Sequence, residues 1–132
     1  MIFRIAALSL TALALAAPAA AERRTGDERL AELLEGRVAG EPTNCISTRR
    51  NARMYIIDDT ALVYDTGRTV YINYTRYPEQ LDSSDVIVIR DNYPQMCKTT
   101  RIEVRNPTMV ESLGTPLFLT DFIPYKRASS ES

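Results

Sequence analysis

Hydrophobic and polar positions divide the chain into three stretches with different patterns. The first is an almost unbroken apolar run at residues 5–17. In the second, residues 25–34, leucines recur at helical spacing and acidic residues lie between them. Beyond Pro42, short runs of β-branched and aromatic residues are separated by Gly, Pro, Asn and Asp. In chain order, these patterns predict a leader segment, one helix and a β-rich domain.

Residues 1–21 have the features of a secretory signal peptide. Arg4 precedes the apolar run, and the segment ends with Pro18 and three alanines, a small-residue cleavage pattern. The run of about 13 residues is shorter than the roughly 20 that a membrane-spanning helix needs, and polar Glu22 follows closely. We therefore expect cleavage after Ala21 and a periplasmic or secreted protein with no membrane span.

The second stretch predicts one short amphipathic helix at about residues 26–35. Leu30, Leu33 and Leu34 share one face, and Gly36 follows the segment. A stripe of three leucines usually docks on the protein's own core, and only occasionally on a partner.

The third stretch predicts seven strands of one β-rich domain, residues 22–127, with a flexible tail at residues 128–132. The strands are expected at residues 45–49, 53–57, 61–64, 69–74, 86–90, 98–104 and 117–123. Asp-rich turns at residues 58–60 and 65–68 indicate hairpins, the second with Gly67 at positive φ. The fold class is mainly β: a small antiparallel sandwich or barrel-like sheet with one short N-terminal helix and one disulfide.

Two of the predicted strands also carry expectations about burial. Residues 100–105 alternate, so Ile102 and Val104 should face inward and Glu103 outward. Residues 86–89 are four consecutive apolar residues, which need cover on both faces. We therefore expect a central strand there, with one face meeting the N-terminal helix.

Cys45 and Cys97 are the only cysteines in the chain. Export would deliver them to an oxidising compartment, where such a pair normally forms a disulfide. Their wide separation lacks the Cys-x-x-Cys spacing of redox-active pairs, so a structural disulfide is the prediction.

Composition and charge remove several classes of function. The absence of histidine excludes His-dependent triads and imidazole metal sites. Without residues 1–21 the chain has 16 − 1 = 15 basic and 17 acidic residues, net −2, which does not favour a nucleic-acid partner. Serine-nucleophile motifs and Gly-rich phosphate loops are missing as well. We therefore expect no catalytic residue, no cofactor and no metal.

Aspartates on predicted turns leave an enzymatic alternative open. They are Asp58, Asp59, Asp65, Asp82, Asp85 and Asp91. Paired carboxylates hydrolyse glycosidic bonds when they lie about 5 to 9.5 Å apart in a cleft, although Asp also favours turns for local reasons. A carboxylate-dependent glycan hydrolase is thus one alternative. A small periplasmic inhibitor of a lytic enzyme, suggested by size and disulfide content, is another.

Tyrosines and arginines alternate through the middle of the chain and suggest a binding face. Tyr71 and Asn73 should share one side of a strand, and Arg68 and Arg76 flank it. Exposed tyrosines stack on sugars or peptides, whereas buried ones pack across strands. These four residues are the candidate binding face.

Several segments, taken together, carry a resemblance that spans the chain after the leader. They are residues 30–36, 45–47, 56–58, 61–64, 70–73 and 122–125, with Pro42 and Cys97. They resemble a family of small exported proteins of proteobacteria, notably sphingomonads. The resemblance implies export and brings no activity or site residue with it.

The sequence therefore predicts an exported, disulfide-linked β domain that acts without catalysis. It would serve as a binding or envelope-associated module, with an envelope protein or a glycan as its partner.

Overall fold

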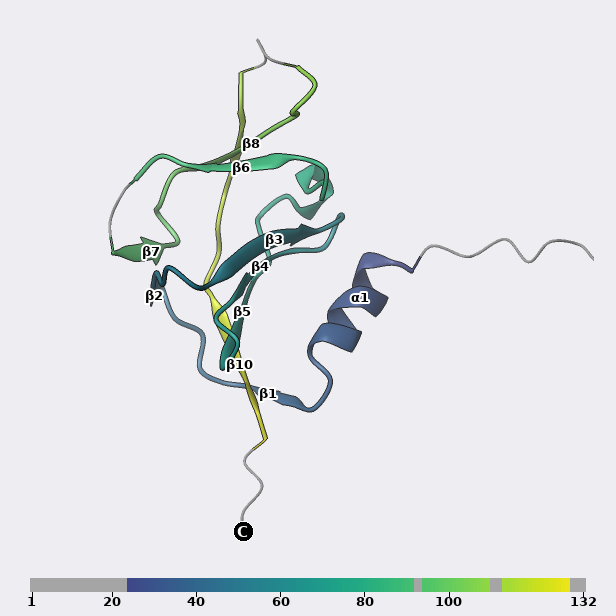
Figure 1. Cartoon of the computed structure of the whole chain (residues 1–132), viewed down its shortest axis with the longest axis vertical. Coiled ribbons are helices and arrows are strands. Elements are labelled where there is room, and N and C mark those ends of the chain that lie inside the picture. The colour runs from purple at the N-terminus through teal and green to yellow at the C-terminus, as the bar shows by residue number, and fades with distance from the viewer. Residues whose placement is uncertain (1–23, 92–93, 110–112, 129–132) are drawn as a thin grey trace, which may run out of the picture.

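The computed structural model describes residues 24–91, 94–109 and 113–128 (Figure 1). Among these described residues, three antiparallel sheets and one α-helix make the fold mainly β, with 42% of them in strands and 11% helical, as predicted. The sheets are not closed into a barrel. The predicted leader and residues 129–132 of the predicted tail lie outside the described residues. Ala128 donates its backbone N–H to the carbonyl oxygen of Gly36 at 3.1 Å.

The predicted N-terminal helix is confirmed as α1, Gly26–Leu33. Its start is set by a capping box: the Thr25 hydroxyl accepts the Glu28 N–H at 3.2 Å, and the Glu28 carboxylate accepts the Thr25 N–H at 3.1 Å. The helix ends before Gly36, which adopts a φ of 74° that favours glycine. It is slightly shorter than the predicted range.

The largest sheet has five antiparallel strands. In spatial order they are β1 (Arg37–Ala39), β10 (Ile123–Arg127), β5 (Thr69–Asn73), β4 (Ala61–Asp65) and β3 (Arg53–Ile57). The predicted turns at residues 58–60 and 65–68 join β3 to β4 and β4 to β5. Gly67 has a φ of 84°, as predicted for that turn.

The remaining described strands form two smaller sheets. β2 (Cys45–Ser47) pairs with β7 (Gln95–Cys97), and the disulfide predicted between Cys45 and Cys97 joins them. β6 (Val86–Ile89), β8 (Ile102–Arg105) and β9 (Thr115–Leu117) form a three-stranded sheet in the order β6-β8-β9. A 3₁₀ turn, η1 (Pro78–Gln80), lies between β5 and β6.

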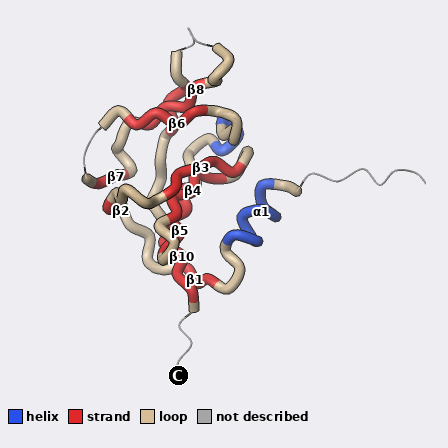
Figure 2. Tube along the Cα trace, in the orientation of Figure 1, coloured by secondary structure: helices blue, strands red, loops and turns tan. Residues whose placement is uncertain are grey.

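The five-stranded sheet lies between α1 and the smaller sheets (Figure 2), and a hydrophobic cluster lies on each of its faces. The helix-side core lies between this sheet and α1 and consists of Leu30, Ile57, Ala61, Val63, Val70 and Ile72. The sheet-side core lies towards the smaller sheets and consists of Ile46, Ile56, Leu62, Tyr64, Leu81, Met96, Ile102, Val104, Leu117, Leu119 and Phe122. Neighbouring residues of β3 and β4 enter opposite clusters, because successive side chains of a strand point to opposite faces.

Several strand boundaries differ from the prediction. Strands β1 and β7 were not predicted. The strand predicted at residues 98–104 begins only at Ile102, because Thr100 folds back on Cys97 through two hydrogen bonds. The strand predicted at residues 117–123 is divided between β9 and β10, and the segment between them crosses from one sheet to another.

The prediction of a central strand at Val86–Ile89 is wrong. β6 is an edge strand that pairs only with β8, and α1 packs on the other sheet instead. Val86 and Ile89 are 49% and 45% exposed. The expected inward alternation of Ile102 and Val104 on β8 is confirmed, with both side chains buried.

Candidate functional site

The structure distributes the four residues of the predicted binding face over three environments. Tyr71 and Asn73 share a face of β5, as expected, and it is the face towards the sheet-side core. Tyr71 is half-buried and packs against Tyr64, with ring centroids 6.3 Å apart. Arg68 is exposed in the β4–β5 turn, and Arg76 is exposed after β5. The four residues therefore do not form one continuous face.

Asn73 is 1% exposed, and its side-chain amide is used inside the protein. Its Nδ2 donates to the carbonyl oxygen of Thr120 at 2.8 Å, and its Oδ1 accepts the Thr120 N–H at 2.9 Å. A buried amide with both groups paired fixes the backbone that it contacts. Asn73 thus anchors the segment between β9 and β10 to β5, which is a structural task.

Arg68 and Tyr71 do meet in a polar hollow beside the β4–β5 turn. This polar hollow has a volume of about 300 Å³ and is lined by Ser47, Arg49, Asn51, Thr66, Arg68, Thr69 and Tyr71. Every lining side chain bears a hydrogen-bonding group, and two are guanidinium groups. A hollow of this composition suits a small anionic or hydroxyl-rich ligand.

The backbone on both sides of the polar hollow is fixed by hydrogen bonds. The Tyr64 hydroxyl accepts the Arg49 N–H at 2.7 Å, which positions the loop after β2. In the β4–β5 turn, the Asp65 carboxylate accepts the Gly67 N–H at 2.7 Å. The Arg37 guanidinium donates to the carbonyl oxygens of Gly67 and Arg68 at 3.2 and 3.4 Å. The two arginines that line the hollow therefore project from an ordered backbone.

The two arginines of the polar hollow have no carboxylate partner in the described part of the chain. Among the described residues, neither Arg49 nor Arg68 forms an ion pair. Asp65, the acidic residue of the adjacent turn, pairs instead with Arg53 at 3.4 Å. Two guanidinium groups without carboxylate partners favour a ligand that carries a carboxylate, sulfate or phosphate.

Arg76 belongs to a second surface, the aromatic patch, together with Tyr77 and Phe118. The Arg76 guanidinium lies 5.8 Å from the Phe118 ring centroid, and Tyr77 meets Phe118 edge to face at 6.0 Å. Tyr77 and Phe118 are 43% and 47% exposed. The patch borders a hollow of about 440 Å³ that Lys98 and Arg101 also line. The patch offers ring stacking and positive charge.

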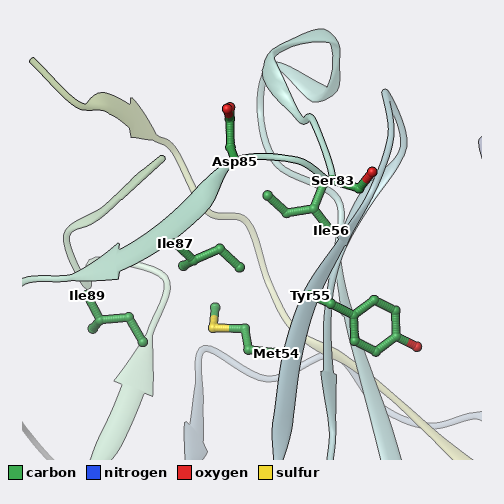
Figure 3. A pocket seen from close by; sticks show the side chains of 7 residues that line it. All are labelled: Met54, Tyr55, Ile56, Ser83, Asp85, Ile87 and Ile89. Carbon is green, nitrogen blue, oxygen red and sulfur yellow. The ribbon is translucent and has the colours of Figure 1, made fainter. Parts of the chain in front are cut away.

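A third hollow, the edge groove, separates β3 from β6 (Figure 3). Its volume is about 600 Å³, and it is lined by Met54, Tyr55, Ile56, Ser83, Asp85, Ile87 and Ile89. The sequence analysis did not predict this groove, because it expected Val86–Ile89 to be covered on both faces. In the structure β6 is an exposed edge strand, and the groove runs beside it.

Four of the six predicted turn aspartates, Asp58, Asp65, Asp82 and Asp91, accept hydrogen bonds from described residues. Asp58 accepts the Ser83 N–H at 2.6 Å, and Asp91 accepts the Arg101 N–H at 3.2 Å. Asp82 accepts two hydrogen bonds from Ser84, which lower the pKa of the Asp82 carboxyl. Burial, with a smaller contribution from Asp82, raises the pKa of Asp85. Asp85 lines the edge groove, and Asp58 lines a different hollow beside Arg29.

The sequence analysis did not place Ser47, Arg49 and Asn51 beside Arg68 and Tyr71 in one hollow. Arg49 was placed at the end of a strand, whereas β2 ends at Ser47 and residues 48–52 form a loop. The adjacent cations Arg49 and Arg50, followed by Asn51, were the available signal. Their contact with the β4–β5 turn depends on tertiary structure.

No group of three or more His, Cys, Asp or Glu residues is placed to hold a metal ion in the described part of the chain. No described helix is long and apolar enough to span a membrane.

Comparison of the chain with protein-family models, curated proteins and solved structures gave no match.

Proposed function

We propose that this protein is an exported, non-catalytic binding module that recognises an acidic glycan of the cell envelope through the polar hollow. The observation that carries the proposal is the pair Arg49 and Arg68, two cations without ion-pair partners among the described residues, beside Tyr71. Charge-assisted hydrogen bonds from guanidinium to carboxylate are stronger than those between neutral groups. Hydroxyl and amide side chains around the hollow bind the sugar hydroxyls.

Export to the periplasm or the exterior is part of the same proposal. The disulfide between Cys45 and Cys97 supports it, because disulfides persist in oxidising compartments and are rare in the cytosol of mesophiles. The leader pattern of residues 1–21 supports it independently. Mass measurement of protein from the periplasmic fraction is expected to give a chain that starts near Glu22 and is oxidised at both cysteines. An uncut leader or free thiols would reject this part.

The binding proposal is tested by calorimetric titration with an oligosaccharide of glucuronic acid and, in parallel, with the neutral oligosaccharide of glucose. We expect binding of the acidic sugar, weakened by added salt because the attraction is partly ionic. Arg49→Ala and Arg68→Ala should each weaken binding by about 10- to 100-fold, since a hydrogen bond to a charged group is worth roughly 1.5–3 kcal/mol.

Arg50→Ala is the matched control for these variants. Arg50 is exposed, follows Arg49 directly and does not line the polar hollow. It should bind the acidic sugar like the unaltered protein. Equal affinity for the neutral and acidic sugars, or normal binding by Arg49→Ala and Arg68→Ala, would reject the proposal. Cleavage of the sugar that is lost in Asp85→Asn would support a carboxylate-dependent hydrolase instead, and capture of a lytic enzyme would support an inhibitor.

A further inference from the structure

The edge groove lies between two strands that each lack a neighbour on one side among the described strands. β3 is the last strand of the five-stranded sheet and pairs only with β4. β6 is the last strand of the three-stranded sheet and pairs only with β8. On the open side of an edge strand, alternate residues present unpaired backbone N–H and C=O groups. Both walls of the groove therefore offer hydrogen bonds to an extended chain.

The floor of the groove consists of apolar residues that belong to the sheet-side core or pack against it. Met54 from β3 and Ile87 from β6 point towards one another across the space, with Ile56 beside them (Figure 3). Ile56 belongs to the sheet-side core, and Met54 and Ile87 pack against it. Ile89, 45% exposed, lies at the end near Met54. Apolar side chains inserted here would extend a core that already exists.

The two ends of the groove differ in charge. Asp85 lies at the end near Ile56, and Asp82 is close enough to it to interact electrostatically. Among the described residues, neither carboxylate has an ion-pair partner. At the opposite end of β3, Arg53 is exposed and pairs with Asp65. A cation on an occupant would therefore be favoured at the Asp85 end.

We propose that the edge groove binds an extended peptide segment of a partner protein by strand addition. The segment has apolar residues at every second position, which face Met54 and Ile87, and a cationic residue at the Asp85 end. A peptide fits better than an acyl chain or a sugar, because only a peptide backbone supplies the regular N–H and C=O groups that both strand edges need. This site is separate from the polar hollow, so either proposal can fail alone.

The test uses a synthetic nine-residue peptide in which valine and threonine alternate after a lysine at one end. Binding to the oxidised protein is followed by fluorescence anisotropy, and amide hydrogen exchange locates the site. We expect slower exchange in β3 and β6 and no change in β1, the opposite edge of the five-stranded sheet. The same peptide with N-methyl groups at alternate positions should bind at least about tenfold more weakly, because it loses the hydrogen bonds to one strand edge.

Two protein variants refine the site. Ile89→Arg should block the groove and weaken binding of the unmodified peptide at least about tenfold, because an arginine side chain fills the apolar space. Val38→Arg is the matched control, since Val38 is exposed on β1 at the opposite edge of the same sheet, and it should bind normally. Asp85→Asn should weaken binding severalfold and remove the preference for lysine at this end.

Three results would overturn the proposal: equal binding of the N-methylated peptide, slower exchange at β1 instead of β3 and β6, or no change in exchange at saturating peptide. A fourth result would also reject it: amide exchange in β3 and β6 that slows as the protein concentration rises, with no peptide present. That result would mean that a second copy of this chain occupies the groove. The comparison between the unmodified and the N-methylated peptide uses the unaltered protein. It therefore tests the proposal even if a protein variant fails to fold.

Discussion

The two faces of the five-stranded sheet are covered in different ways. On one face, α1 seals the helix-side core, where Ala61, Val63, Val70 and Ile72 are all 0% exposed. On the other face, two short sheets cover the sheet-side core, and the edge groove and the polar hollow both lie at its margins. A short sheet has ends and edges that leave margins open, whereas α1 packs directly on the apolar residues of β3, β4 and β5. Both proposed binding sites therefore lie where the sheet-side core is incompletely covered.

The difference also appears in how each cover is attached. α1 is held by leucine packing, helped by an exposed ion pair between Arg29 and Asp58 at 3.7 Å. Polar and covalent links contribute on the other face: the disulfide joins β2 and β7 to each other within their own sheet, and Asn73 anchors the segment after β9 to β5. The smaller sheets also supply buried apolar residues of their own, such as Ile46, Met96 and Ile102, whereas α1 supplies Leu30.

The strongest test of this comparison removes the disulfide. The double variant Cys45→Ser, Cys97→Ser should lose roughly 4 kcal/mol of unfolding free energy, because the bond closes a loop across a sequence separation of 52. Urea unfolding of both proteins measures the loss. Hydrogen exchange should accelerate in β2 and β7 before it does so in β4. Equal acceleration in α1 and β7 would contradict a separate attachment of the two covers.

A second test makes the same isoleucine-to-alanine substitution in the helix-side core and at the edge groove. Ile72→Ala, at a fully buried position of the helix-side core, should cost about 3 kcal/mol, because it leaves a cavity in a closed core. Ile89→Ala, at the open groove, should cost less than about 1 kcal/mol. Thermal unfolding of the two variants gives the comparison. Equal losses would mean that the edge groove is closed in solution.

The smallest expected effect concerns acid stability of the three-stranded sheet. Hydrogen bonds from Arg90, and more weakly from Arg105, hold the pKa of Glu103 below its ordinary value of 4.5. Because the folded pKa is lower than the unfolded one, this interaction stabilises the protein above pH 4.5 and is lost as the pH falls through the folded pKa.

Glu103→Gln should therefore reduce stability at pH 7, and its difference from the unaltered protein should shrink as the pH falls below 4.5. Urea unfolding at pH 7 and pH 3 measures both differences. Glu79→Gln is the control, because Glu79 forms no ion pair among the described residues. A Glu103→Gln difference that is the same at both pH values would show that the carboxylate charge is not responsible.

Patterns among residues close together in the sequence were enough to predict several elements of this protein. The leucine spacing predicts α1, and the Asp-rich turns predict the β3–β4–β5 meander, because these features involve residues near one another in the sequence. The cysteine count, together with the leader, predicted the disulfide. Alternation along β8 predicted its buried side correctly.

Tertiary structure decided which strands are edges and which side chains meet. Four consecutive apolar residues in β6 are equally compatible with a buried central strand and with an edge beside an apolar groove, and only the placement of the two sheets distinguishes them. Likewise, Arg49 and Arg68 line one hollow because the loop after β2 packs beside the β4–β5 turn. Periodicity specifies the direction of a side chain on its own strand, but not what lies opposite.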